Sequence, residues 1–261
     1  MTSRIAAAFA ERTAFIPFLS SGYPHPDDTP RLLATLAEAG ADIIELGVPF
    51  SDPLADGPTI QAASWDALGH GVTLDSTLAQ LGEVSSDLPP VVIFSYINPI
   101  LRMGIDVFLE RAERAGAAGV LVTDLPVGAH LEMERKLAGA SLDLIPLAAP
   151  TTTAERLETI VGHASGFLYY ISRLGVTGAR AALDESLKDK VDELRGRVNL
   201  PVAVGFGIST PQQASEVAAF ADGVVVGSAL IAALGESERA FADLAHSLGA
   251  AVHVSSGSDV T

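Results

Sequence analysis

Carboxylates gather at the end of one apolar segment of the sequence. Glu45 stands within the run 42–48, and Asp56 lies in the loop 51–58, whose prolines and glycine favour a shaped turn. Burial raises the pKa of a carboxyl group and suits it to donate a proton, whereas an ionised carboxylate nearby can stabilise a developing cation. A structural glutamate and a simple Asp-Gly-Pro turn are the alternatives. The pair predicts acid/base chemistry.

Two glycine turns, 205–209 and 227–230, follow the last two apolar segments of the chain. Glycine lets the backbone approach an anion closely, and the N–H groups at a helix start attract it. One Gly-x-Gly sequence is usually only a turn, but two turns after consecutive segments favour a phosphate site. Because the formal net charge is −16, we expect backbone N–H groups to hold the phosphate. The substrate is therefore predicted to be phosphorylated.

A third candidate is the loop 172–180, which carries two glycines, two arginines and Thr177. Most loops of this composition are mobile connections. Lids that exclude water from a reactive intermediate share the same features, and Thr177 would be the functional residue of such a lid.

Several catalytic chemistries lack the residues that they need. The chain has no cysteine, which excludes thiolate nucleophiles, disulfides and thiolate metal sites. Its lysines, Lys136, Lys188 and Lys190, fall in predicted outer helices or their flanks, which argues against a Schiff base. The histidines form no spaced cluster, and His25 alone follows a predicted strand, so a zinc site has little support. Proton transfer is left to carboxylates, and no metal is expected.

Short apolar runs alternate with helical patterns, which predicts a single (β/α)₈ TIM barrel. Runs such as 202–204 are apolar at every position, as parallel strands buried on both faces should be. Eight strand–helix units in a chain of this length favour a closed barrel over an open doubly wound sheet. The predicted helices include 28–39, 104–115, 153–163 and 211–220. The predicted strands are 15–20, 42–48, 91–96, 119–124, 143–149, 167–172, 201–206 and 223–228.

Length and composition fit one cytoplasmic catalytic domain. With 261 residues, 48% of them hydrophobic, the chain can bury a full barrel core. The apolar run 5–10 is too short for a signal peptide or a membrane span and predicts a short extra N-terminal helix. The acidic charge disfavours binding to nucleic acid and anionic membranes. We expect a barrel over 1–252 and a disordered tail over 253–261.

The stretch from Glu45 to Gln61, ELGVPFSDPLADGPTIQ, closely resembles the signature of the tryptophan synthase α subunit family. The likeness extends in order through FIPFL at 15–19, YINP at 96–99, DLP at 124–126, SRLGVTG at 172–178, GFGIS at 205–209 and GSA at 227–229. It covers nearly the whole predicted barrel.

This resemblance implies a metal-free lyase that cleaves indole-3-glycerol phosphate into indole and D-glyceraldehyde 3-phosphate by a retro-aldol reaction. Glu45 would protonate the indole carbon that bears the glycerol chain, and Asp56 would hydrogen-bond the ring nitrogen and stabilise the indoleninium cation. The implied substrate contacts are Phe18, Tyr96, Tyr169, Thr177 and Phe206, with the phosphate at Gly178, Gly207, Gly227 and Ser228.

The resemblance also implies a partner, a β subunit that carries pyridoxal phosphate and consumes the indole in an α2β2 heterotetramer. It implies no cofactor in this chain. The sequence departs from the family pattern at Tyr23, Leu101 and Leu174. The implied partner contacts are Pro53, Asn98, Asp124 and Pro126.

Other readings of the same residues stay open. Another phosphate-binding barrel enzyme, such as a sugar-phosphate isomerase or indole-glycerol-phosphate synthase, would share the glycine turns, but the stretch 45–61 argues against it. A non-catalytic subunit that activates a β partner is disfavoured by the retention of both Glu45 and Asp56. A stand-alone indole-releasing lyase is separated from the partnered subunit only by binding or kinetic data.

Overall fold

The computed structural model describes residues 3–84, 88–125, 131–139, 141–171, 185–205 and 207–255. Within them, nine parallel strands form one sheet in the order β5-β4-β3-β2-β1-β9-β8-β7-β6. The strands are β1 (Ala14–Ser20), β2 (Ile44–Gly47), β3 (Val91–Ser95), β4 (Gly119–Val122), β5 (Asp143–Leu144), β6 (Leu147–Ala148), β7 (Leu168–Ile171), β8 (Val202–Gly205) and β9 (Gly223–Val226).

The strands at the two ends of this order, β5 and β6, belong to one stretch of chain. Pro146 lies between them and has no N–H to donate, which interrupts the strand. On either side, the Ile145 N–H donates to the Val120 carbonyl and the Tyr169 N–H donates to the Pro146 carbonyl, both at 2.9 Å. The stretch 143–148 therefore joins β4 to β7, and the sheet closes. The predicted (β/α)₈ barrel is confirmed, with its fifth strand split in two.

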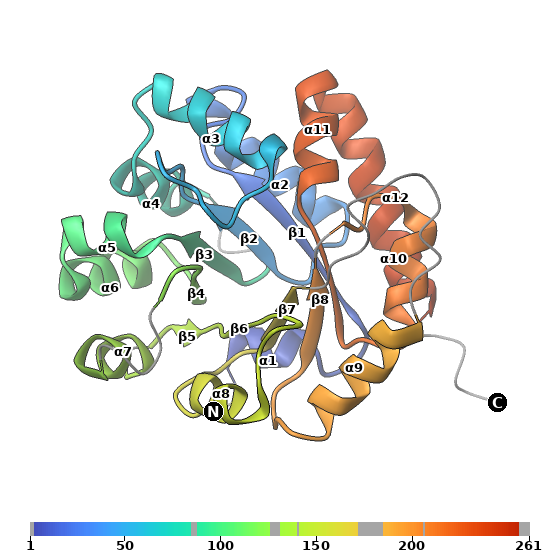
Figure 1. The fold of residues 1–261 in the computed structure, drawn as a ribbon. Coiled ribbons are helices and arrows are strands. Elements are labelled where there is room, and N and C mark those ends of the chain that lie inside the picture. The colour runs from blue at the N-terminus through green and yellow to red at the C-terminus, as the bar shows by residue number, and fades with distance from the viewer. Residues whose placement is uncertain are drawn as a thin grey trace.

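Helices surround the strands on the outside, as Figure 1 shows. The four helices predicted by range appear within two residues of their expected ends as α2, α6, α8 and α10. The described helices are α1 (Arg4–Ala8), η1 (Pro26–Asp28), α2 (Thr29–Glu38), α3 (Pro58–Gly69), α4 (Leu74–Gly82), α5 (Ile97–Met103), α6 (Ile105–Arg114), α7 (Leu131–Ala138), α8 (Ala154–Val161), α9 (Glu185–Arg195), α10 (Pro211–Ala218), α11 (Ser228–Glu236) and α12 (Glu238–Ser255).

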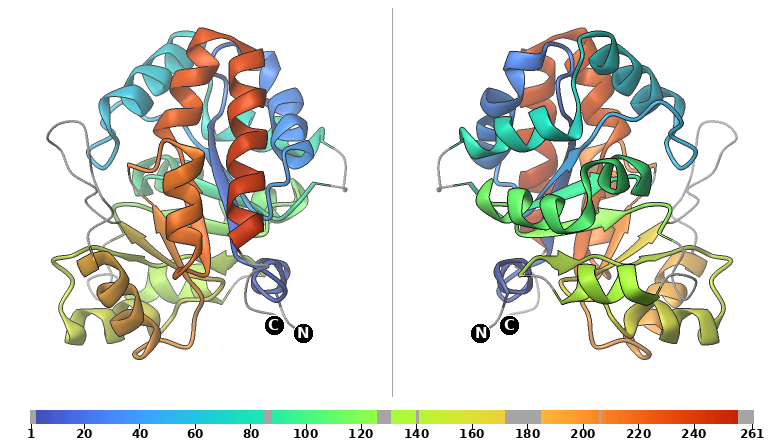
Figure 2. Two further views of the ribbon diagram at one scale, coloured as in Figure 1. Left: turned by 90° about the vertical axis from the view of Figure 1, so that its right-hand side faces the viewer. Right: turned by 90° about the vertical axis from the view of Figure 1, so that its left-hand side faces the viewer.

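Strand alternation divides the core into two layers. Outward residues such as Ile44 and Leu46 pack with the helices, and inward residues such as Ile43 fill the barrel interior. The predicted extra N-terminal helix, α1, lies at one end of the barrel (Figure 2). Its Ile5 and the following Phe9 join the interior cluster, so this end is closed by apolar side chains. The open end is left for a ligand.

The C-terminal helix α12 continues to Ser255, so the expected start of a disordered tail at His253 is wrong. His253 Nε2 lies 2.8 Å from Asp42 Oδ2, and the same oxygen accepts a 2.8 Å hydrogen bond from the Phe15 N–H. A partner so distant in the sequence could not be inferred from the Ser- and Gly-rich end of the chain. Residues 256–261 lie outside the described part. Among the described residues, no helix has the length and apolarity to cross a membrane.

Candidate functional site

Glu45 points into the barrel from β2, at the end opposite α1. It pairs in register with Phe18 of β1 and shares the inward parity of Ile43, as its place in the alternating strand predicts. Its side chain is 1% exposed, and among the described residues its Oε1 has no hydrogen-bond partner. Burial without a partner raises the pKa of Glu45 from 4.5 to about 8. At neutral pH the group is therefore a carboxylic acid that can donate a proton.

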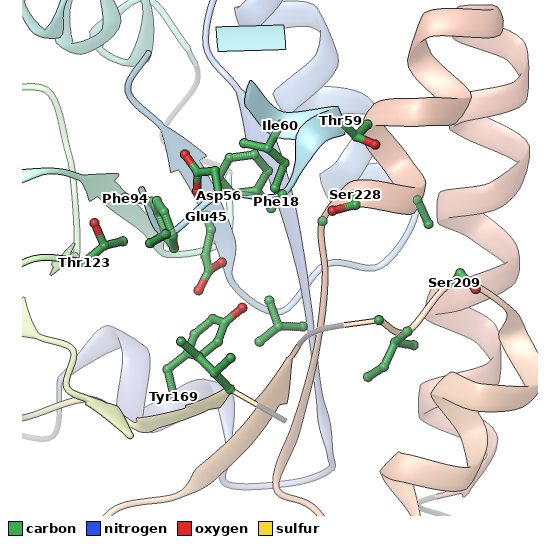
Figure 3. A pocket seen from close by; sticks show the side chains of 18 of the residues that line it. Phe18, Glu45, Asp56, Thr59, Ile60, Phe94, Thr123, Tyr169, Ser209 and Ser228 are labelled. Atoms are coloured by element: carbon green, nitrogen blue, oxygen red, sulfur yellow. The ribbon is translucent and has the colours of Figure 1, made fainter. Parts of the chain in front are cut away.

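A cavity of about 730 Å³ opens above Glu45 at the carboxyl ends of the strands. Its lining is mainly apolar, as a pocket for a flat aromatic ligand requires. Figure 3 shows Glu45 and Tyr169 pointing toward one another at the bottom, with Asp56 beside Phe18 on the other side. The lining residues are Phe18, Glu45, Ala55, Asp56, Gly57, Pro58, Thr59, Ile60, Phe94, Thr123, Leu147, Tyr169, Ile171, Gly207, Ile208, Ser209, Val225, Gly227, Ser228 and Ala229.

Asp56 reaches this cavity from the loop between β2 and α3. The Asp56 N–H donates to the Pro53 carbonyl at 3.0 Å, and the Gln61 side-chain amide donates to the Asp56 carbonyl at 2.8 Å. Burial raises the pKa of Asp56 from 3.8 to about 6, and a hydrogen bond from Tyr96 opposes this rise. Asp56 is therefore mostly ionised at neutral pH, while the more deeply buried Glu45 is mostly neutral.

Aromatic rings form the walls of the cavity. Phe18 and Phe94 meet edge to face with ring centroids 5.4 Å apart. Tyr169 is 8% exposed, and burial together with the charges of Glu45 and Asp56 holds the pKa of its hydroxyl well above the ordinary value. Gly205 lies against the Tyr169 ring, where an added Cβ would collide with the ring. The missing side chain therefore makes room for Tyr169 at the cavity floor.

The far side of the cavity can accept an anion. Helix α11 begins at Ser228 and has no side-chain cap, so N–H groups of its first turn face the cavity end lined by Gly227 and Ser228. Helix α10 differs, since Thr210 and Gln213 form a capping box that occupies its N-terminus. Of the two glycine turns, the one before α11 thus leaves more backbone N–H groups free to hydrogen-bond an anion, and Gly207 lines the cavity from the neighbouring turn.

The predicted substrate residues divide into three groups. Phe18, Tyr169, Gly207, Gly227 and Ser228 line the cavity with Glu45 and Asp56. Tyr96 does not line it and instead bonds to the Asp56 loop. The remaining predicted positions, which lie outside the described residues, are Thr177, Gly178 and Phe206.

The predicted partner residues that are described lie on or near the surface. Asn98 and Asp124 are exposed, and Pro53 is half-buried. Asp124 Oδ1 also accepts a 2.7 Å hydrogen bond from the Ile97 N–H at the start of α5. Pro126 lies outside the described residues. The described part of the chain brings together no group of three or more His, Cys, Asp or Glu side chains suited to a metal ion.

Sequence reasoning missed several lining residues. Phe94 and Ile171 have the inward parity of their strands, so alternation from Val92 and Tyr169 could have identified them. Thr59 and Ile60 come from the first turn of α3, directly after the carboxylate loop. Thr123 follows β4 at its carboxyl end, where barrels carry functional residues.

The barrel and the chemistry at its mouth together define a class. A neutral acid and an ionised carboxylate, set in an aromatic cavity with an uncapped helix start at one end, are typical of a barrel enzyme that performs acid/base catalysis on an apolar phosphorylated substrate. Comparison with known proteins identifies the family within this class.

The family model for the tryptophan synthase alpha chain matches residues 6–254. The tryptophan synthase alpha chain of Carboxydothermus hydrogenoformans is 47% identical over 235 residues, which cover 88% of each chain. That of Gloeobacter violaceus is 48% identical over 237 residues, or 87% of this chain and 85% of the relative. The chain belongs to the tryptophan synthase alpha chain family, and it is a carbon–carbon lyase of tryptophan biosynthesis.

Solved structures agree with this assignment. The α subunit of tryptophan synthase from Legionella pneumophila superposes with a TM-score of 0.88 at 36% identity, over 97% of this chain and 99% of that one. A chain of Mycobacterium tuberculosis tryptophan synthase superposes with a TM-score of 0.89 at 38% identity, again over 97% and 99%. The TIM-barrel architecture and the family are therefore supported independently by sequence and by structure.

Proposed function

We propose that this chain catalyses the α reaction in the cavity above Glu45, with Glu45 as the acid/base and Asp56 as its ionised companion. The reaction cleaves indole-3-glycerol phosphate into indole and D-glyceraldehyde 3-phosphate. The observation that carries the proposal is the buried Glu45 carboxyl group, which has an unpartnered oxygen and a pKa of about 8 at the floor of an aromatic cavity. A protonated acid aimed at a flat ring is what cleavage by ring protonation requires.

The proposed chemistry begins with transfer of the Glu45 proton to C3 of the indole ring, the carbon that bears the glycerol chain. The ring becomes an indoleninium cation, and the Asp56 carboxylate accepts its N–H and stabilises the positive charge. The C3–C1′ bond then breaks, and its electron pair returns to the ring and restores neutral indole. The C1′ hydroxyl proton leaves to a base as the aldehyde forms, and the Glu45 carboxylate produced in the first step is the nearest candidate.

The rest of the cavity fits the two ends of this substrate. Phe18, Phe94 and Tyr169 offer apolar surface to the indole ring, since edge and face contacts favour aromatic partners. The uncapped start of α11 offers backbone N–H groups to the phosphate at Gly227 and Ser228. We propose that Thr177, Gly178 and Phe206 complete the site from the segments beyond the described residues.

We further propose that the product indole passes to a tryptophan synthase β subunit, which carries pyridoxal phosphate, in a cytoplasmic α2β2 complex. This chain itself is proposed to need no cofactor. The proposed contact surface, Pro53, Asn98, Asp124 and Pro126, adjoins exposed apolar side chains: Leu54 is 95% exposed and Leu101 is 50% exposed. Exposed apolar groups beside polar ones are typical of a protein-binding surface.

The test measures indole release from indole-3-glycerol phosphate by the purified chain, with and without a tryptophan synthase β subunit. We expect activity that the β subunit stimulates, and losses of at least about a hundredfold in Glu45→Gln and Asp56→Asn, because each variant removes a transition-state interaction. Activity without any partner effect would favour the stand-alone lyase. Wild-type rates in both variants would exclude the proposed acid/base pair.

A further inference from the structure

Tyr96 bonds to the loop that carries Asp56 through its hydroxyl group. The hydroxyl accepts a 2.9 Å hydrogen bond from the Ala55 N–H, and it lies close enough to the carboxylate of the next residue, Asp56, to lower the pKa of that group. Thr123, from the carboxyl end of β4, lies beside this hydroxyl. One buried oxygen thus joins the Asp56 loop to the barrel strands.

The surroundings of Tyr96 hold its hydroxyl in one place. Its ring stacks on Phe50 with centroids 5.0 Å apart and an interplanar angle of 30°, and its side chain is 3% exposed. The next residue along the chain is also fixed, because the Ile97 N–H donates to Asp124 Oδ1 at 2.7 Å. A hydroxyl on such a support can orient a neighbouring group without moving itself.

Two hydrogen bonds fix the backbone of Asp56 independently of Tyr96. The Asp56 carbonyl accepts from the Gln61 amide at 2.8 Å, and the Asp56 N–H donates to the Pro53 carbonyl at 3.0 Å. These bonds place the loop, and the Tyr96 hydroxyl acts on the carboxylate at its end. Loss of that hydroxyl would therefore free the Ala55 N–H and the Asp56 carboxylate, while these two bonds would still hold the Asp56 backbone.

We propose that Tyr96 is a positioning residue that acts through Asp56, orienting the Asp56 carboxylate toward the cavity instead of contacting the substrate. Asp56 and Thr123 line the cavity, whereas Tyr96 does not. The inference rests on the proposed role of Asp56 in the α reaction. A donor held against the ionised oxygen also favours the charged form, so the hydrogen bond lowers the pKa of Asp56.

Tyr96→Phe tests this role because it keeps the ring that stacks on Phe50 and removes only the hydroxyl. We expect kcat for indole release to fall about tenfold with KM changed less than about twofold, since a group that orients a catalytic carboxylate acts mainly on the transition state. The acid limb of the pH profile should move to higher pH. Tyr170→Phe is the matched control, because Tyr170 is also buried but packs outside the barrel. This variant should change neither kcat nor the acid limb of the pH profile.

Two further measurements decide the outcome. Titration of the Asp56 carboxyl group by ¹³C NMR should give a pKa above about 6 in Tyr96→Phe, and an unchanged pKa would overturn the proposal. In the Asp56→Asn background, Tyr96→Phe should cost no further activity, because the two residues act as one unit. Additive losses with a raised KM would instead indicate direct substrate contact. Full activity in Asp56→Asn would sink the proposed function, and the NMR titration would still report on positioning.

Discussion

The pKa values of Glu45 and Asp56 predict a bell-shaped dependence of indole release on pH. The proposed reaction needs Glu45 protonated and Asp56 ionised in the same molecule. Burial raises the pKa of Glu45 to about 8, so its acid form is present below that pH and is lost above it. Burial raises the pKa of Asp56 to about 6, so its carboxylate is present above that pH and is lost below it. The active form therefore dominates between about pH 6 and pH 8.

The size of the expected change in kcat/KM follows from the titrations of Glu45 and Asp56. At pH 7 each group is about nine-tenths in its required form, because each pKa lies about one unit away. At pH 9 the acid form of Glu45 falls to about one-tenth, and at pH 5 the carboxylate of Asp56 does the same. We expect kcat/KM to fall about tenfold from pH 7 toward each limit.

The assay measures initial rates of indole release from pH 5 to pH 9.5 at constant ionic strength, with circular dichroism at each pH as a check on folding. In Asp56→Asn the acid limb should disappear while the basic limb stays, since the amide cannot titrate. A flat profile from pH 7 to pH 9.5 in the wild-type chain would refute the role of Glu45 as the proton donor. An acid limb that persists in Asp56→Asn would assign that limb to another group.

Three further predictions concern stability and the phosphate. Between pH 4.5 and about 8 the folded chain keeps a proton on Glu45 that the unfolded chain has released, so wild-type stability should fall across this interval, on the order of several kcal/mol. In thermal unfolding Glu45→Gln should lose this contribution and keep only the fall below about pH 6 that the raised pKa of Asp56 causes. Ser228→Asp should raise KM at least about tenfold without loss of stability, because a carboxylate suits a helix start but repels phosphate; Ser228→Asn is the neutral control. Asp42→Ala should cost about 1–3 kcal/mol in denaturant unfolding and leave kcat unchanged, since it strips the Phe15 N–H of its partner far from the cavity; loss of kcat would contradict this.

Strand alternation made the barrel and the position of Glu45 predictable from the sequence. Apolar runs identified every strand, and the inward parity of Glu45 follows from its place two residues after Ile43. The break in the fifth strand was less visible. Pro146 was present in the sequence, but whether a proline bends, ends or only interrupts a strand depends on what its neighbours bond to across the sheet.

Side-chain roles were harder to predict than side-chain positions. The family resemblance implied that Tyr96 contacts the substrate, whereas the structure directs its hydroxyl to the Asp56 loop. That difference depends on how the loop 51–58 folds over the end of β3, which local patterns do not encode. The ordered position of His253 was not predicted for a similar reason, because its partner Asp42 is remote in the sequence and nothing near the C-terminus indicates their contact. Hydrophobic periodicity carries no information about polar pairs between residues that are distant in the sequence.

Burial gives the two carboxyl groups different protonation states at neutral pH. Glu45 lies on a strand inside the barrel, has an unpartnered oxygen and keeps its proton at neutral pH. Asp56 lies on a loop at the rim, receives a hydrogen bond from Tyr96 and gives up its proton more readily. An apolar environment thus separates the pKa values of two carboxyl groups in one cavity without any nearby cation among the residues that line it.

The most direct test of this account is a ¹³C NMR titration of the Glu45 carboxyl group in the ligand-free chain, with its resonance assigned by comparison with Glu45→Gln. Because the group is buried and one of its oxygens has no partner in the described structure, we predict a midpoint near pH 8. A midpoint near the ordinary value of 4.5 would mean that Glu45 is ionised at neutral pH, and it would contradict its role as the acid that protonates the indole ring.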